Sequence, residues 1–133
     1  MADHPNTELM RKGYAAFQRG DMETLRTELF QPDIVWHQVG DNLVSGDYQG
    51  AEQVLALFGN IFQLTGGNFR PELKEIRATD DLILGIGVAN GTRDGKSVTD
   101  EPYLHVARVR DGKMAESWVI NLNTARANEF WSN

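Results

Sequence analysis

The sequence lacks cysteine and lacks any long hydrophobic run among its 133 residues. Without cysteine there is no disulfide, thiolate nucleophile, cysteine-ligated zinc or iron–sulfur cluster. No stretch approaches the roughly 20 apolar residues of a membrane-spanning helix, and the opening MADHPNTELM has no apolar signal-peptide core. We therefore expect no membrane partner and a cytoplasmic location.

Basic charge is also scarce. Thirteen Lys and Arg residues stand against 19 Asp and Glu residues, for a formal net charge of -6. The basic residues are scattered, and the densest grouping, Arg108 and Arg110, alternates along a predicted strand. Nucleic acid is therefore an unexpected partner, because phosphate binding needs clustered basic side chains. The chain length suits one hydrophobic core, which predicts a single domain over residues 1–133.

Helical periodicity dominates the first half of the chain. Met10, Tyr14 and Phe17 share one face of a first helix, which is expected to end at Gly20. Asp21 is expected to cap a second helix with Met22, Leu25 and Leu29 on its apolar side. The strongest amphipathic pattern predicts a third helix, ended by Thr65 to Gly67, whose apolar stripe is Ala51, Val54, Leu55, Phe58, Ile61 and Phe62.

One strand is expected between the second and third helices. The stretch DIVWHQVG, residues 33–40, alternates so that Trp36 and Gln38 point to one face and His37 to the other. The following residues, GDNLVSGDYQG, are interpreted as a loop. His4, in the polar N-terminal segment, is expected to be a solvated bystander.

From Phe69 onward the hydrophobic period changes to two. Strands are predicted at about 69–79, 82–92, 97–109 and 113–121, and the Asp-Gly pairs at 94–95 and 111–112 are typical of hairpin turns. Gly85 and Gly87 share one face of their strand, which suits either a sharp bend of the strand or a close approach by another group to its backbone. The last residues are expected to form a short helix that packs Phe130 and Trp131.

These elements predict an α+β fold in which three N-terminal helices cover one face of a curved antiparallel sheet, followed by a short C-terminal helix. A strongly curved sheet closed by helices leaves a cone-shaped interior. Such a concavity is the default site for a small ligand.

Several segments resemble the SnoaL-like and ketosteroid isomerase-like branch of the nuclear-transport-factor-like superfamily. They are YAAFQRGD, DIVWHQVG, AEQVLALFGNIF, HVARVRDGKMAESW and EFWS, and they span nearly the whole chain. The resemblance implies a cystatin-like α+β barrel and a homodimer formed through the outer sheet face. In this sequence that face would carry Leu104, Val106, Trp118 and Ile120.

The resemblance also implies site residues. His37 takes the position of the proton-shuttling Asp of ketosteroid isomerase, and His105 takes that of the acid that donates a hydrogen bond to the oxyanion. Tyr14 lies one residue away from the position that aligns with the Tyr at the oxyanion in ketosteroid isomerase. Asn121 falls where the family lines its cavity, on the same strand face as Ser117 and Val119. Asn123 stands near the place of an Asp that SnoaL-like chains often carry.

Two function classes follow from this resemblance. The first is acid–base catalysis of the isomerase, cyclase or hydratase type on a small, apolar, oxygenated molecule, with His37 as general base and His105 as polariser of an oxygen. The second is a non-catalytic module for hydrophobic ligand binding or dimerisation, in which His37 is merely a polar strand residue. The residues expected to line the ligand site in either class are Tyr14, Phe58, Phe62, Tyr103, Val119 and Asn121.

No cofactor is expected. His37, His105 and Glu101 could form an open metal site, but no close ligand spacing such as HExxH is present, so no metal site is predicted. The glycine-containing pieces GTRDGK and TGG lack the pattern of a phosphate-binding loop.

Overall fold

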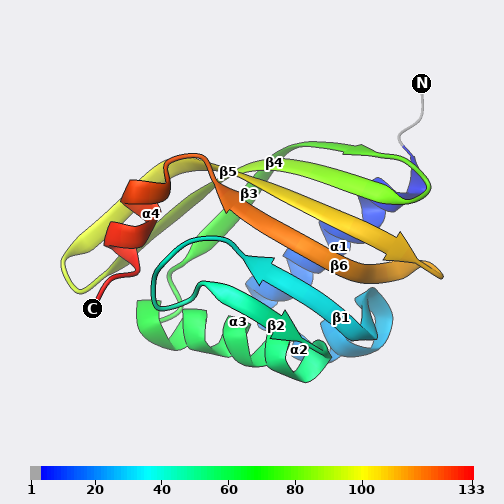
Figure 1. The fold of residues 1–133 in the computed structure, drawn as a ribbon, viewed down its shortest axis with the longest axis horizontal. Helices are drawn as coiled ribbons and strands as arrows, with labels where there is room; N and C mark the ends of the chain where they lie inside the picture. Colours follow the sequence, from blue (N-terminus) through cyan, green and yellow to red (C-terminus); the bar gives the residue numbers. More distant parts are fainter. Residues whose placement is uncertain (1–3) are drawn as a thin grey trace.

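The structure is a computed structural model that describes residues 4–133. It consists of a six-stranded sheet with helices packed on one face (Figure 1). Helix α1 packs on β3 and β4, and α3 packs on β1, β2 and β4. No helix in the described part of the chain is long and apolar enough to cross a membrane. The elements in chain order are α1 (Pro5–Arg19), α2 (Met22–Thr24), the π-helical turn η1 (Leu25–Leu29), β1 (Phe30–Gln38), β2 (Gly46–Gln49), α3 (Ala51–Thr65), β3 (Arg70–Ala78), β4 (Leu82–Arg93), β5 (Lys96–Arg110), β6 (Lys113–Asn121) and α4 (Thr124–Phe130).

The predicted meander of β3 to β6 is confirmed. The β4–β5 turn has positive φ at Asp94 (48°) and Gly95 (76°), and the β5–β6 turn has it at Asp111 (51°) and Gly112 (78°). Two consecutive residues with positive φ form the turn whose twist matches that of paired strands. Asp-Gly is suited to it because Gly has no Cβ and Asp tolerates the left-handed region.

The sheet is mixed, and the expectation of a purely antiparallel sheet is wrong in this respect. The strand order is β2-β1-β6-β5-β4-β3, and β1 pairs with β6 in parallel. The segment 46–49, interpreted as part of a loop, forms the short edge strand β2, which pairs antiparallel with β1. The strand has only four residues, from Gly46 to Gln49, which are too few to show the alternation of apolar and polar side chains typical of a strand.

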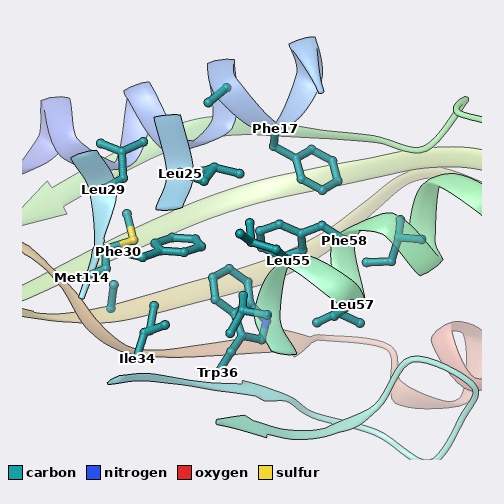
Figure 2. Packing of buried hydrophobic residues seen from close by; sticks show 14 of the residues in the cluster. Phe17, Leu25, Leu29, Phe30, Ile34, Trp36, Leu55, Leu57, Phe58 and Met114 are labelled. Carbon is teal, nitrogen blue, oxygen red and sulfur yellow. The ribbon is translucent and has the colours of Figure 1, made fainter. Parts of the chain in front are cut away.

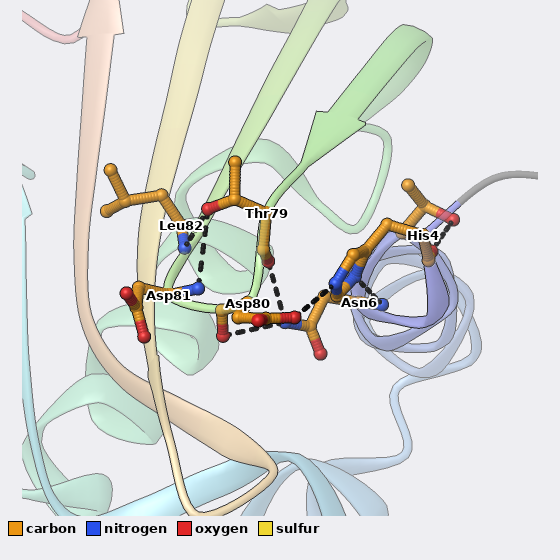
Figure 3. Close-up of polar contacts among 7 residues, drawn as sticks. His4, Asn6, Thr79, Asp80, Asp81 and Leu82 are labelled. Carbon is orange, nitrogen blue, oxygen red and sulfur yellow. Dashed lines mark hydrogen bonds and ion pairs between the residues drawn. The ribbon is translucent and has the colours of Figure 1, made fainter.

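The start of α1 is held to the β3–β4 turn by side chains (Figure 3). His4 caps the helix, since its Nδ1 accepts a hydrogen bond from the Asn6 backbone N–H at 3.1 Å, and its Nε2 lies 2.8 Å from Asp80 Oδ1. The Asn6 amide donates to the carbonyls of Thr79 and Asp80. His4 is therefore a structural cap, and its interpretation as a solvated bystander is wrong.

The hydrophobic core lies between the helices and the inner sheet face (Figure 2). Phe58 of α3 stands at its centre, with the rings of Phe17 at 5.2 Å and Trp36 at 5.1 Å in edge-on contacts. Aromatic pairs in this geometry add about 0.5–1.5 kcal/mol beyond the burial of their area. These contacts join α1, β1 and α3 around one ring.

Candidate functional site

A cavity of about 100 Å³ lies between the inner face of the sheet and the helices. Apolar side chains form most of its wall, among them Phe30, Phe58, Ile61 and Met114. The C-terminal helix contributes part of the wall as well, including Phe130. For comparison, an apolar cavity of about 150 Å³ accommodates benzene. The cavity is therefore smaller than one that holds benzene, which limits an enclosed ligand to a small molecule.

Four polar groups form one hydrogen-bonded chain at this cavity. The Tyr103 hydroxyl lies 2.9 Å from the Tyr14 hydroxyl, and the Tyr14 hydroxyl lies 3.0 Å from His105 Nδ1. On the other side of the imidazole, His105 Nε2 lies 3.1 Å from Ser117 Oγ. Tyr14, Tyr103 and His105 line the cavity, and Ser117 lies fully buried behind them.

Strand alternation explains how these groups come together. Glu101, Tyr103 and His105 occupy every second position of β5 and face inward, while Tyr14 comes from α1. Tyr103 needs Gly87 opposite it on β4, because a Cβ there would lie 2.7 Å from the Tyr103 Cζ and hydroxyl oxygen. The expectation of a close approach at this glycine is confirmed.

The hydrogen-bonded chain is uncharged at neutral pH. Burial lowers the pKa of His105 to about 4, so its imidazole is neutral. Burial also raises the pKa of Tyr103 to about 12, and burial together with the neighbouring Tyr103 raises the pKa of Tyr14 well above its ordinary value. Such a chain can donate a hydrogen bond to a ligand oxygen without presenting a charge.

Glu101 is the only carboxylate among the described residues that line the cavity. Its side chain is 11% exposed, and its Oε1 accepts a hydrogen bond from Arg126 Nη1 of α4 at 2.5 Å. From the sequence alone, Glu101 enters only as one of three residues that could hold a metal, at a site that is not predicted. The sequence signal for its position is its spacing: Glu101 lies two residues before Tyr103 on the same strand, so both side chains face inward.

Gln38 is a second cavity residue that sequence analysis did not assign to the site. Trp36 Nε1 donates a hydrogen bond to Gln38 Oε1 at 3.0 Å. Because the indole nitrogen is only a donor, this bond fixes which end of the Gln38 amide is the oxygen. The Gln38 amide nitrogen is left as a donor beside the cavity.

Most of the residues predicted for the ligand site line the cavity. These are Tyr14, Phe58, Tyr103, His105, Val119 and Asn121. Phe62 does not line it, and its assignment to the ligand site is wrong. It lies on a flank of α3, half-buried, and stacks on Phe17 with ring centroids 4.8 Å apart.

His37 lies outside the cavity, and the prediction that places it in the pocket is wrong. Trp36 and Gln38 take the inward positions of β1, so alternation turns His37 to the outer sheet face. There its Nδ1 lies 2.7 Å from Asp47 Oδ1 and its Nε2 lies 2.7 Å from Glu116 Oε2. His37 and His105 thus lie on opposite faces of the sheet and do not converge on one ligand.

Comparisons with known proteins agree with this architecture. The profile of the SnoaL-like domain matches residues 10–117. Bal32a, from a soil-derived mobile gene cassette, superposes with a TM-score of 0.89 at 35% identity over 95% of each chain. A Xanthomonas campestris protein of unknown function with a cystatin-like fold gives a TM-score of 0.87 at 23% identity, over 96% of this chain and 98% of that one. IdmH of Streptomyces antibioticus, provisionally described as a polyketide cyclase, gives 0.72 at 30% identity over 95% and 99%.

Proposed function

This chain belongs to the SnoaL-like family, and on that premise we propose that it binds a small, largely apolar, oxygenated molecule and acts on it by acid–base catalysis. The observation that carries this proposal is the chain from Tyr103 to His105, a line of neutral hydrogen-bonding groups in an otherwise apolar cavity. Isomerase, cyclase and hydratase reactions of carbonyl compounds and epoxides are assisted by hydrogen bonds that polarise the carbonyl or epoxide oxygen. The similarity to IdmH supports a reaction of the cyclase type.

Within this proposal the inward residues of β5 have different roles, one as hydrogen-bond donor and one as base. The Tyr103 hydroxyl donates a hydrogen bond to the ligand oxygen, and Tyr14 and His105 hold that hydroxyl in place. Glu101, two positions away on the same face, accepts or returns the proton at carbon. This role replaces the one that sequence analysis assigned to His37.

The alternative is a ligand-binding module without catalysis. One observation favours it, because the Glu101 carboxylate already forms a hydrogen-bonded ion pair with Arg126. A carboxylate that already accepts a hydrogen bond from a guanidinium is less available to a ligand. Binding without turnover would then be the function of the cavity.

Proton NMR in D2O with cyclohexanone, cyclohex-2-enone and cyclohexene oxide tests both functions at once. Ligand line broadening reports binding, while deuterium incorporation next to the carbonyl, or opening of the epoxide, reports catalysis. We expect Glu101→Gln to abolish turnover and keep binding, and Tyr103→Phe to weaken both. Tyr48→Phe is the matched control, since its hydroxyl bonds Val44 O outside the cavity. Binding without any chemistry would favour the module, and no binding would contradict both functions.

We also propose that the outer sheet face joins two copies of the chain. Two apolar rows cross three strands there, one of Leu84, Val106 and Trp118 and the other of Ile86, Leu104 and Ile120. Ile86 is 39% exposed, and an exposed apolar patch of this kind is typical of an interface. Sedimentation should show a dimer that Ile86→Lys dissociates, while Leu122→Lys, at an exposed leucine outside the sheet, leaves it intact.

A further inference from the structure

The direction of the hydrogen-bonded chain is tied to the tautomer of His105. A neutral imidazole has one donor nitrogen and one acceptor nitrogen. Tyr14 contacts Nδ1 and Ser117 contacts Nε2, so both ring nitrogens are engaged. Moving the ring hydrogen from one nitrogen to the other therefore reverses every donor and acceptor along the chain.

Two arrangements satisfy all the internal contacts. In the first, Tyr103 donates to Tyr14, Tyr14 donates to His105 Nδ1, and Nε2–H donates to Ser117. In the second, Ser117 donates to Nε2, Nδ1–H donates to Tyr14, and Tyr14 donates to Tyr103. Tyr103 accepts no bond from the chain in the first arrangement, and its own hydrogen points away from the chain in the second.

Neither arrangement satisfies both ends. The first leaves the Ser117 hydroxyl hydrogen without an acceptor, and the second leaves the Tyr103 hydroxyl hydrogen without one. Among the residues described here, neither hydroxyl has a hydrogen-bond partner outside the chain. Ser117 is 0% exposed and Tyr103 is 3% exposed, so each arrangement leaves one hydroxyl hydrogen without an acceptor among the described side chains. A partner at the cavity end can therefore decide between them.

We propose that the Tyr103–Tyr14–His105–Ser117 chain reverses its direction, with a change of the His105 tautomer, according to whether the ligand oxygen accepts or donates a hydrogen bond. A carbonyl oxygen selects the second arrangement, because Tyr103 then donates to it. A ligand hydroxyl that donates to the Tyr103 oxygen selects the first. In the change from first to second, Tyr14 gives its proton to Nδ1, Tyr103 gives its proton to Tyr14, and water gives one to Tyr103. At the other end Nε2–H passes to Ser117, whose own hydroxyl proton leaves to water, so each of the four groups ends neutral and with one hydrogen.

This inference rests on the proposed function and names the ligand class more closely. The cavity is suited to an oxygen that alternates between carbonyl and hydroxyl, as it does when a ketone becomes its enol. The Tyr103 O–H donates to the carbonyl form, and the Tyr103 oxygen accepts from the hydroxyl form. No charged group has to move for either form to be held.

Nitrogen-15 NMR of histidine-labelled protein at neutral pH reads the tautomer directly. The probes are cyclohexanone, which only accepts, pyrrole, which only donates through N–H, and benzene, which does neither. Signals of the other histidines are assigned with His4→Asn and His37→Asn. We expect cyclohexanone to shift His105 toward Nδ1–H and pyrrole to shift it toward Nε2–H. Benzene should leave the His105 tautomer as it is in the protein without a probe.

Two variants keep this test decisive. Tyr14→Phe cuts the chain next to the imidazole, so cyclohexanone should still bind while His105 no longer responds. Tyr103→Phe removes the ligand-facing end and should also abolish the response, whereas Tyr48→Phe should not. Probes that bind, as judged by their line broadening, but give one and the same tautomer would overturn this inference alone. Failure of every probe to bind would overturn it together with the proposed function.

Discussion

The imidazole of His37 stacks on the indole of Trp118 on the outer sheet face, with ring centroids 5.3 Å apart and an interplanar angle of 21°. Each nitrogen of this imidazole also contacts a carboxylate, Asp47 on the edge strand β2 and Glu116 on β6. Arg108 also lies over the Trp118 indole, with its guanidinium carbon 5.9 Å from the ring centroid. The Arg108 Nε lies 3.8 Å from Glu116 Oε1. His37 therefore links three strands.

The stability that His37 provides should depend on pH. Its hydrogen bonds to Glu116 and then Asp47 raise its pKa above the ordinary value near 6.5. Because the folded pKa is raised, the stabilisation is fully present below the unfolded pKa and is lost as pH rises through the folded pKa. Relative to His37→Gln, the wild type should gain about 1 kcal/mol at pH 5.5 and much less at pH 9. Urea unfolding at both pH values measures this, and an equal difference at the two would contradict it.

The Gly87→Ala substitution should displace the Tyr103 phenol. The new Cβ would lie 2.7 Å from both the Tyr103 Cζ and the Glu72 carbonyl oxygen, so a packed ring or the backbone has to move. We expect a loss of about 1–3 kcal/mol in the free energy of unfolding, together with weaker cyclohexanone binding. Gly59→Ala is the control, because Gly59 is an exposed position in α3 with no atom within 4 Å of its would-be Cβ. It should stabilise the protein by up to about 1 kcal/mol.

Phe58→Ala should be among the costlier single truncations in the core. Phe58 is 5% exposed and contacts rings from α1 and β1, so its removal leaves a cavity that the neighbours fill only in part. The expected loss is about 3–5 kcal/mol in the free energy of unfolding, measured by urea titration. Phe62→Ala, at a half-buried ring on the same helix, should cost clearly less. Equal losses would show that Phe58 is not the centre of the core.

The Glu101–Arg126 pair should show strong coupling in a double-mutant cycle. Arg126→Met leaves the nearly buried Glu101 carboxylate without its partner, which should cost about 1–3 kcal/mol, whereas adding Glu101→Gln should recover part of that loss. The matched control is the exposed pair Arg110 and Asp33, whose coupling should stay below about 1 kcal/mol. Urea unfolding of the four proteins in each cycle gives both values. Coupling no larger than in the control would contradict the prediction.

Local sequence patterns were sufficient for most of the elements. The Asp-Gly pairs at 94–95 and 111–112 determine the hairpin turns, because consecutive positive φ angles suit few other residue pairs. The stop of α3 before Gly66 follows from its left-handed conformation in the same way. Alternation along β5 placed Tyr103 and His105 on one face, and that grouping is the part of the site that sequence alone determined.

Only the tertiary structure decided which face of β1 looks inward and what it meets there. Alternation separates His37 from Trp36 and Gln38, but a period of two is equally consistent with either set being buried. The choice depends on the parallel pairing of β1 with β6, which places Trp36 beside Ser117 and His37 beside Trp118. The residues of each pair are about 80 positions apart in the sequence. The contact of Tyr14 with His105 is likewise made between a helix and a strand that no local pattern connects. Residue types and their periods are local properties, whereas the convergence of side chains on a cavity is set by long-range packing.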